Sequence, residues 1–394
     1  MSRLLSGIRV LDFSRVLAGP FCTAMMADLG AEIIKVEPPG GDDQRAMGAF
    51  RDGLSVSFEL INRNKRSLKL DLKSGAGQDI AHRLAAECDV VVENFRPGVA
   101  DRLGIGYPAL RALRPDLIYC SISGFGQSGP LAEAPSYDVI AQALSGLMSV
   151  TGPEDGEPVL VGDSVGDTVS GLFAAWAISS ALFRRQVTGE GARLDVAMFD
   201  SLFALLPTAL ARWQVSGQAP GRQGNQHPLS APFGAYRAAD GDFILAVANN
   251  PLFRRLAVAI GRPDLAEDAR YSSDQSRFRN REALRGEIEA WTLARPAAAV
   301  VAHLAAAGIP ASVVADVAEA ATGAHARHRQ LLTEVSHPVL GSVRLPEQPV
   351  HVDGMARGDL RPAPTLGEDG SDVLSELLGT TPDEIAALQA AGVI

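Results

Sequence analysis

The chain has 394 residues, with 36 Lys and Arg against 46 Asp and Glu, so its formal net charge is −10. This acidic balance disfavours nucleic acid and anionic membranes as the main partners of the protein. Hydrophobic residues make up 46% of the chain, which is long enough for two domains and a sizeable core.

The cysteines and the apolar runs indicate a protein of the reducing cytoplasm. Cys22, Cys88 and Cys120 are odd in number, widely spaced and without metal-ligand spacing, so we expect buried thiols and no metal site. The first seven residues lack the apolar core of a signal peptide. The longest apolar run, Leu172 to Phe183, is too short to cross a bilayer, and we expect a buried core helix there.

The first elements in chain order form a strand–helix–strand unit. A strand is expected at residues 8–13, a helix at 21–29 and a second strand at 31–37. Glu37 ends the second strand with an acidic residue, which is the layout of a nucleotide-binding fold.

The alternation of strands and helices continues to residue 215. Further strands are expected at 67–72, 89–93, 117–123 and 192–197, and helices at 76–86, 107–113 and 199–215. This pattern predicts an α/β fold in which a Rossmann-like large domain, residues 1–215, contains a parallel sheet covered by helices.

A polar, Gly-rich loop at 217–230 separates this region from a different pattern. A hairpin is expected at 233–238 and 243–248 around Asp240-Gly241, followed by helices at 251–261, 281–292 and 297–307. We interpret residues 225–320 as a smaller α+β domain. The segment 330–394 is expected to return to the large domain and complete it.

Two aspartates precede the long apolar helix, in the segment Gly162-Asp163-Ser164-Val165-Gly166-Asp167 that ends at Gly171. An Asp before such a helix most often caps its free N–H groups. A carboxylate at a glycine-flanked helix N-terminus can instead attack an activated acyl group. A nucleophile there must be ionised, and burial raises the pKa of a carboxyl, so we expect helix N–H donors to hold its charge. The segment alone leaves both interpretations open.

Residues 63–73 form the densest basic segment of the chain. Their lysines and arginines fit a solvated edge strand and a phosphate clamp about equally well. Arg96 and Arg102 could add to such a clamp. The segment Gly124-Phe125-Gly126-Gln127-Ser128-Gly129 matches a dinucleotide-binding pattern weakly, since Pro130 follows at once, and we interpret it as the wall of an active site. His325 and His328 have no accompanying zinc motif and are expected at the surface.

Several segments together resemble class III CoA-transferases, a group that includes formyl-CoA transferase and carnitine CoA-transferase and also contains α-methylacyl-CoA racemases. The resemblance covers nearly the whole chain. It is carried by the following segments: 7–13, 18–20, 30–37, 64–67, 93–98, 124–130, 188–191 and 224–225.

The resemblance implies a CoA-transferase that moves CoA from an acyl-CoA donor to a carboxylic acid through an aspartyl-CoA thioester. Asp167 would be the nucleophile and Asp163 a neighbour. CoA would be a substrate rather than a permanently bound cofactor, and two chains would form an interlocked, ring-shaped homodimer. The residues expected to contact CoA are Val16, Leu17, Ala18, Leu70, Asp71, Leu72, Lys73, Asn94, Phe95, Arg96 and Arg102.

Departures from the family pattern bear on the substrate. Pro38 stands where formyl-CoA transferases tend to carry an arginine, and residues 221–228 lack their run of glycines, which disfavours formate and oxalate. The basic, polar loop at 221–228 suggests a dicarboxylate acceptor, with succinyl-CoA as a common donor in the family. The alternative is a racemase, although Tyr137 stands in the segment where racemases carry a His. Glycine N–H groups of 124–129 or 224–225 would stabilise the tetrahedral oxyanions.

Overall fold

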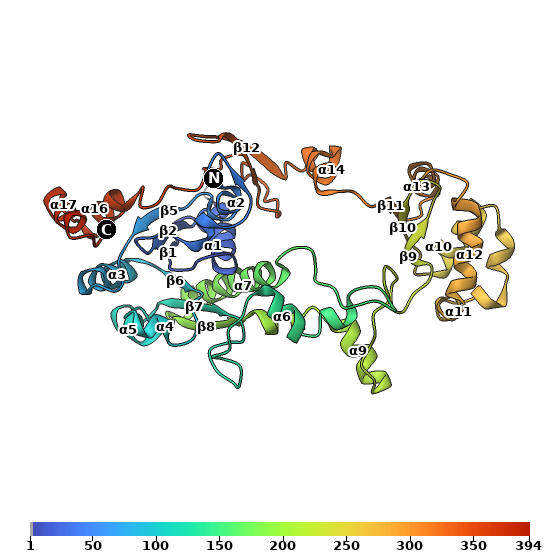
Figure 1. Cartoon of the computed structure of the whole chain (residues 1–394), viewed down its shortest axis with the longest axis horizontal. Helices are drawn as coiled ribbons and strands as arrows, with labels where there is room; N and C mark the ends of the chain where they lie inside the picture. Colours follow the sequence, from blue (N-terminus) through green and yellow to red (C-terminus); the bar gives the residue numbers. More distant parts are fainter. Residues whose placement is uncertain (1–2) are drawn as a thin grey trace. The chain divides into compact units, whose positions relative to one another are not determined.

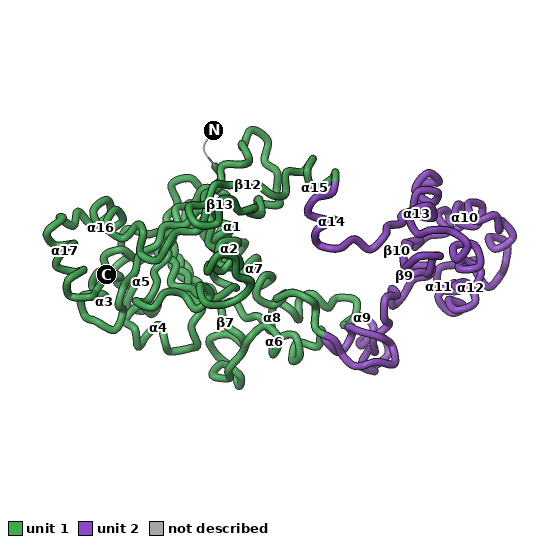
Figure 2. Tube along the Cα trace, turned by 45° about the horizontal axis from the view of Figure 1, so that its top comes forward, with its two compact units in different colours: residues 1–147, 160–211, 324–394 green, residues 148–159, 212–323 purple. Residues whose placement is uncertain are grey.

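A computed structural model describes residues 3–394 as two compact units, which Figure 2 distinguishes by colour. Unit 1 comprises Met1–Leu147, Leu160–Ala211 and Ala324–Ile394. Unit 2 comprises Met148–Val159 and Arg212–Gly323. The chain therefore leaves unit 1 and returns to it twice.

Unit 1 is built around a six-stranded sheet in which every neighbouring pair is parallel. The strand order is β5-β2-β1-β6-β7-β8 (Figure 1). From β1 the chain adds β2 and β5 on one side and then β6, β7 and β8 on the other, so the order reverses between the neighbours β1 and β6. Ligands of such sheets bind at the carboxyl ends of the strands beside this reversal. The expected α/β fold with a parallel sheet is confirmed. The strands are β1 (Arg9–Asp12), β2 (Glu32–Glu37), β5 (Arg66–Lys69), β6 (Val90–Glu93), β7 (Ile118–Ser123) and β8 (Ala192–Ala197).

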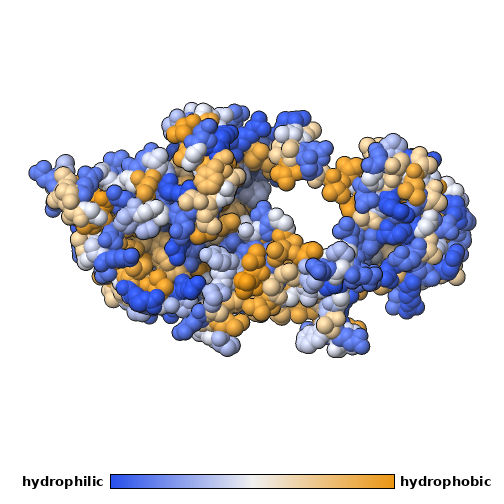
Figure 3. Space-filling view, viewed as in Figure 1, coloured by the Kyte–Doolittle hydropathy of each residue, from blue (hydrophilic) through white to orange (hydrophobic). Residues whose placement is uncertain are grey.

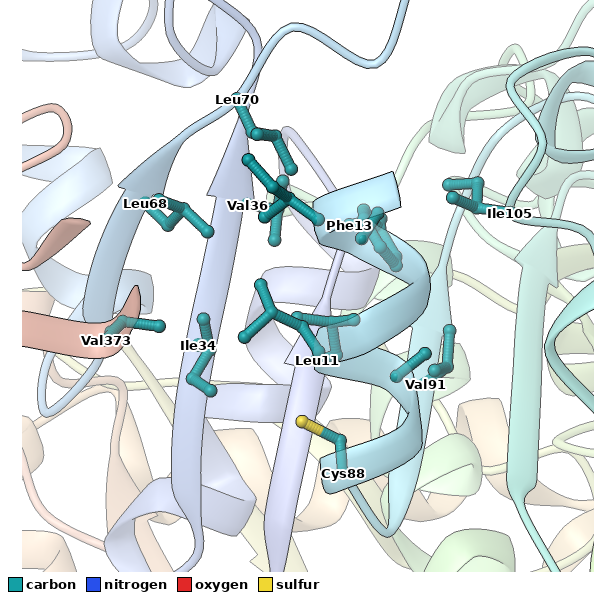
Figure 4. Packing of buried hydrophobic residues seen from close by; sticks show 14 of the residues in the cluster. Leu11, Phe13, Ile34, Val36, Leu68, Leu70, Cys88, Val91, Ile105 and Val373 are labelled. Atoms are coloured by element: carbon teal, nitrogen blue, oxygen red, sulfur yellow. The ribbon is translucent and has the colours of Figure 1, made fainter. Parts of the chain in front are cut away.

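Helices cover both faces of this sheet, because alternate residues of its strands point to opposite sides. On one face Leu11, Ile34 and Val91 pack with helix α3 and with Val373 of α16 (Figure 4). On the other face Val10 and Ile33 pack against α1 and α7. The helices of unit 1 are α1 (Ala18–Asp28), α2 (Val56–Asn62), α3 (Gly75–Glu87), α4 (Val99–Arg102), α5 (Tyr107–Leu113), α6 (Asp138–Leu144), α7 (Val165–Thr188), α8 (Met198–Phe203), α15 (Ala324–His328), α16 (Gly370–Leu378) and α17 (Pro382–Ala390).

The helix expected at residues 199–215 is in fact two helices. The chain breaks after α8, and α9 (Pro207–Ser216) begins at a proline. Proline has no N–H for a helical hydrogen bond and disfavours helical geometry in the residue before it, so Pro207 starts a helix rather than continuing one. The short elements of unit 1 are a 3-10 turn (Asp43–Ala46), β3 (Phe50–Arg51), β4 (Leu54–Ser55), β12 (Leu332–His337) and β13 (Gly341–Pro346).

Helix α7 crosses α1 at very close range. A Cβ atom added to Gly171 would lie 2.6 Å from the carbonyl oxygen of Ala18 and 3.2 Å from the backbone nitrogen of Cys22. Only a glycine allows this approach. Because Asp167 precedes Gly171 by one helical turn, the crossing places Asp167 beside the start of α1.

The apolar character of α7 extends beyond its buried face. By length and composition alone the 24-residue helix could span a membrane, and 39% of its most apolar window is buried. The run at 172–183 is thus part of a longer helix that is buried only in part. Leu172, Trp176, Phe183 and Val187 recur on one side of the helix and are 53%, 67%, 71% and 70% exposed.

Unit 2 contains a three-stranded antiparallel sheet in the order β11-β10-β9. Its first two strands form the expected hairpin, with Phe243 opposite Tyr236. Both side chains belong to a core formed with the surrounding helices. The elements are a 3-10 turn (Met148–Val150), β9 (Phe233–Arg237), β10 (Asp242–Ala246), α10 (Asn250–Ala259), two 3-10 turns (Pro263–Ala266 and Ala269–Tyr271), α11 (Asp274–Arg279), α12 (Arg281–Thr292), α13 (Ala297–Ala306), β11 (Ala311–Val313) and α14 (Val317–Thr322).

Candidate active site

Two adjoining pockets lie at the carboxyl ends of the parallel strands of unit 1. The smaller has a volume of about 190 Å³ and is lined by residues that follow β1, β6, β7 and β8. The larger, of about 650 Å³, is lined by residues that follow β1, β2, β5 and β6. Arg15 and Phe95 line both pockets, so the two adjoin beside the reversal between β1 and β6.

The smaller pocket brings together many of the residues singled out in the sequence. They come from the loop and helix start after β1, from the loop after β6 and from the first turn of α7. Separated by up to 151 positions along the chain (167 − 16), they meet in one cavity. The predicted site residues that line it are Val16, Leu17, Ala18, Asn94, Phe95, Arg96 and Asp167.

The larger pocket collects the segment after β5. Leu70, Asp71, Leu72 and Lys73 all line it, together with Phe95. Arg102 lines neither pocket, since its side chain is exposed on α4. Its expected contact with CoA therefore stays a prediction.

The carboxyl of Asp167 is partly buried in the first turn of α7. Burial raises its pKa to about 7, and the nearby carboxylate of Asp138 adds to the shift. The expectation that helix N–H groups hold the charge of Asp167 is wrong for one of these donors, the N–H of Gly166. The N–H of Gly166 donates to Asp138 Oδ1 at 2.6 Å instead.

Asp138, which starts α6, thus supplies the carboxylate at the N-terminus of α7. Its other carboxyl oxygen accepts a 2.7 Å hydrogen bond from Gln142, and Gln142 also accepts from the N–H of Val161. A Cβ atom on Gly166 would lie 2.8 Å from Asp138 Oδ1, so a glycine is needed for this approach. The cap comes from a residue 28 positions earlier in the chain, and no local pattern could have identified it.

Asp163 differs from Asp167 in its exposure and in its position relative to the pockets. It is exposed, and its Oδ1 accepts a 2.7 Å hydrogen bond from the N–H of its neighbour Ser164. Among the described residues that line the two pockets, Asp163 does not occur. The structure therefore separates two aspartates that the motif alone presented as competitors.

At the start of the basic segment 63–73, the cations are neither free for phosphate nor solvated, because they are paired with acidic side chains. Arg63 Nε donates to Asp28 at 3.1 Å, and Lys65 Nζ lies 3.2 Å from Asp12. Arg66, on the edge strand β5, pairs with acidic side chains of β2 and α16. Among the described cations of this segment, only Lys73 lines either of the two pockets at the carboxyl ends of the strands. The pattern of charges along a strand does not reveal which of them find buried partners.

Two further expectations need correction: that Glu37 binds a nucleotide, and that the N–H groups of the loop 124–129 bind an oxyanion. Glu37 does not present a free carboxylate to a nucleotide, because Arg45 and Ser67 donate to it at 2.7 and 2.6 Å. Gly124 lines the smaller pocket, as expected of a site wall. Farther along this loop, the N–H groups of Gly126 and Gln127 already donate to Ser123 and Asp195 and are not available to a bound oxyanion.

Glu93 is a buried acid to which the motifs gave no role. It ends β6, and burial raises its pKa to about 7, although the N–H of Phe95 donates to it at 2.8 Å.

His227, Gly224 and Asn225 lie in unit 2, where the His227 ring stacks on Phe233 at 4.8 Å. Within residues 3–394 no three His, Cys, Asp or Glu side chains gather as a metal site would need.

Comparison with known proteins gives one consistent family. The family model of CoA-transferase family III matches residues 5–370. The acetyl-CoA:oxalate CoA-transferase of Acetobacter aceti is 43% identical over 94% of this chain and 95% of its own. The succinyl-CoA–D-citramalate CoA-transferase of Chloroflexus aurantiacus is 37% identical over 100% of this chain and 98% of its own.

Solved structures agree with the sequence relatives. A CaiB/BaiF family protein from Brucella suis superposes with a TM-score of 0.83 at 36% identity, covering 96% of this chain and 100% of its own. A hypothetical protein from Mycobacterium tuberculosis gives a TM-score of 0.85 at 30% identity, over 94% and 99% of the two chains. The resemblance drawn from the sequence motifs is confirmed: this chain is a CoA-transferase and belongs to CoA-transferase family III.

Proposed function

We propose that the protein transfers CoA from an acyl-CoA to a second carboxylic acid, with Asp167 as the covalent carrier. The observation that carries this proposal is the position of Asp167. It is a half-buried carboxyl in a small pocket, and that pocket adjoins a larger one with room for a nucleotide. A carboxylate shielded from water is a better nucleophile than a solvated one, and its covalent intermediates are protected from hydrolysis.

The reaction would proceed by two exchanges on one side chain. A carboxylate oxygen of Asp167 attacks the thioester carbon and the C–S bond breaks, which gives a mixed anhydride of Asp167 with the acyl group and releases CoA as a thiolate. The thiolate then attacks the Asp167 carbonyl of that anhydride, the C–O bond breaks, and the first acid departs as a carboxylate. An acceptor carboxylate repeats both steps in reverse and leaves as the new acyl-CoA. Charge balances at each step without a net proton transfer.

The two pockets divide the substrate between them. The larger pocket, with Lys73 at its edge, would hold the nucleotide part of CoA, and the smaller would hold the thioester. Lysine and arginine side chains neutralise the phosphates of such ligands. Arg96 lines the smaller pocket and would supply such a charge.

The start of α1 is the better candidate for oxyanion stabilisation. Leu17 and Ala18 line the pocket of Asp167, and in the part of the chain that the structure describes no side chain caps this 11-residue helix. Free N–H groups at a helix N-terminus favour a negative charge. They would act on the tetrahedral intermediates in place of the engaged Gly126 and Gln127 N–H groups.

For the acids we propose a dicarboxylate acceptor and a donor such as succinyl-CoA. Support comes from the relatives, whose names include succinyl-CoA:glutarate and succinyl-CoA:mesaconate CoA-transferases. The name of the Acetobacter aceti relative contains oxalate, which the departures from the formyl-type pattern do not favour here. A short dicarboxylate also suits the volume of about 190 Å³ beside Asp167.

A screen of donor thioesters against short mono- and dicarboxylic acids tests the proposal. We expect succinyl-CoA with a C4 or C5 dicarboxylate to give the new thioester by mass spectrometry. Hydroxylamine added after the donor alone should convert Asp167, and no other carboxyl, into a hydroxamate found by peptide mapping. Solvent deuterium at the α-carbon of a branched acyl-CoA, without any transfer, would instead show a racemase.

We further propose that the protein is a homodimer whose chains interlock. The exposed apolar side chains of α7, which Figure 3 shows as part of a hydrophobic area over α6 and α7, support a protein partner on this face. Light scattering should give the mass of a dimer at micromolar concentration. Trp176→Glu should weaken that dimer, and Val258→Glu, at an exposed position of α10, should not. A monomeric wild-type protein would contradict the proposal.

A further inference from the structure

Val16 has a backbone conformation that its side chain disfavours. Its φ angle is +64°, in the left-handed region, where a β-branched residue is a true outlier. The residue lies between β1 and α1, and it lines the pocket of Asp167. Strained residues at such places persist only where the surrounding structure determines them.

A buried ion pair supplies the determining contacts. The N–H of Val16 donates to Asp42 Oδ1 at 2.9 Å, and Lys35 Nζ donates to Asp42 Oδ2 at 2.7 Å. The same ammonium donates to the carbonyl oxygen of Ser14 at 3.0 Å. One Lys–Asp pair thus binds the chain on both sides of Arg15.

Both members of the pair are out of contact with solvent. The side chains of Lys35 and Asp42 are 0% and 1% exposed, and both residues belong to the wall of the larger pocket. Burial alone would raise the pKa of Asp42, but the charge and hydrogen bond of Lys35 outweigh it and hold that pKa below its usual value. Asn94 also holds this loop, because its side chain accepts a hydrogen bond from the N–H of Arg15 at 2.9 Å and donates one to the carbonyl of Arg15 at 2.7 Å.

We propose that Lys35 and Asp42 are positioning residues, whose ion pair holds Val16 in the left-handed conformation that lets the Val16–Ala18 segment line the CoA pocket. The inference rests on the proposed function, since it assigns these pockets to CoA. Neither side chain touches the reacting atoms. Their contribution is to keep the loop in one conformation before the substrate arrives.

The expected signature is a change in affinity rather than in turnover. If the loop adopts its competent form only part of the time, the apparent dissociation constant rises by the inverse of that fraction. At saturating acyl-CoA, nearly all molecules have the loop in its competent form, so kcat changes little. A competent fraction of roughly 10% would raise Kd and KM about tenfold.

The decisive variant combines Lys35→Met with Asp42→Ala, which removes the tether without leaving a buried charge unpaired. Calorimetry with CoA itself gives Kd, and transfer assays give KM and kcat. We expect Kd and KM to rise about tenfold, with kcat within about threefold of wild type. Adding Val16→Gly should bring both back to within about threefold, because glycine adopts the left-handed region without strain.

Matched controls separate positioning from general stability. Arg63→Met with Asp28→Ala removes another buried ion pair of unit 1 and should leave the Kd for CoA unchanged. Asp52→Gly, at an exposed residue with φ +49°, should not rescue the tether variant. If the double variant does not fold, Lys35→Met with Asp42→Asn carries the same test without an unpaired buried charge, with a rise of about threefold that Val16→Gly reverses.

The outcomes distinguish this inference from the proposed function. A folded tether variant with wild-type Kd, or a raised Kd that Val16→Gly does not lower, overturns the inference alone. Wild-type protein that binds CoA but transfers it to no acid overturns the proposed carrier role of Asp167 and leaves the affinity test intact. Wild-type protein that binds no CoA overturns both.

Discussion

Asp167→Ala is expected to reduce CoA transfer by at least about 10⁴-fold, the scale seen when a covalent nucleophile is removed. The physical reason is that no other carboxyl takes its place. Asp138 lies nearby, but its two oxygens already accept from Gly166 and Gln142. Without the carrier carboxylate, neither the mixed anhydride nor the aspartyl thioester can form.

Asp163→Ala is the matched control, because it removes the same side chain four residues earlier in the chain. Asp163 is exposed and outside both pockets, so transfer should remain within about threefold of wild type, as expected for a surface change. Both variants should bind CoA with the wild-type Kd in calorimetry. Equal loss of transfer in the two variants would contradict the assignment of the nucleophile.

The rate of transfer at low substrate is expected to rise with pH through about 7. Only the ionised carboxylate of Asp167 attacks a thioester, and burial, with the charge of Asp138 in addition, raises its pKa to about 7. Asp138→Asn keeps an oxygen for Gly166 but removes the second charge. It should move the acidic limb of kcat/KM to lower pH by about one unit or less, because burial remains the larger cause.

The same raised pKa makes Asp167 a cost to stability at alkaline pH. Folding favours the protonated carboxyl, so its contribution is fully present below the unfolded pKa near 3.8 and is lost as pH rises through about 7. A shift of about three units corresponds to at most ~4 kcal/mol. Asp167→Asn, although inactive, should therefore raise the Tm at pH 8 and change it much less at pH 4. An equal change in Tm at both pH values would contradict the raised pKa.

The parallel sheet and its helices could be predicted because their signals are local. Runs such as Val90-Val91-Val92 are typical of strands buried on both faces, and Gly30 marks the end of a helix. The hairpin around Asp240-Gly241 follows from turn chemistry. The break before Pro207 was also present in the sequence, since a proline in a helical pattern indicates a boundary.

The site was only partly predictable, since its electrostatics depend on distant residues. The choice of Asp167 over Asp163 came from family spacing, and burial in the pocket now gives it a physical basis. The Asp138 cap, the Lys35–Asp42 pair and the buried partners of Lys65 carry no signal in one sequence. The contacts of Asp138 with Gly166 and of Lys65 with Asp12 join segments far apart in the chain, and Lys35 meets Asp42, seven residues later, only because of how the loop after β2 turns.

The adjoining pockets at Arg15 and Phe95 have a consequence for how such an enzyme can be specialised. In the proposed mechanism the nucleotide part of CoA can stay in the larger pocket, while the two acids occupy in turn the smaller pocket beside Asp167. Outgoing and incoming acids must then satisfy the same walls. If the proposed mechanism holds, evolution cannot restrict the size of one acid without restricting that of the other, which suits such an enzyme to reversible exchange between acids of similar size and charge.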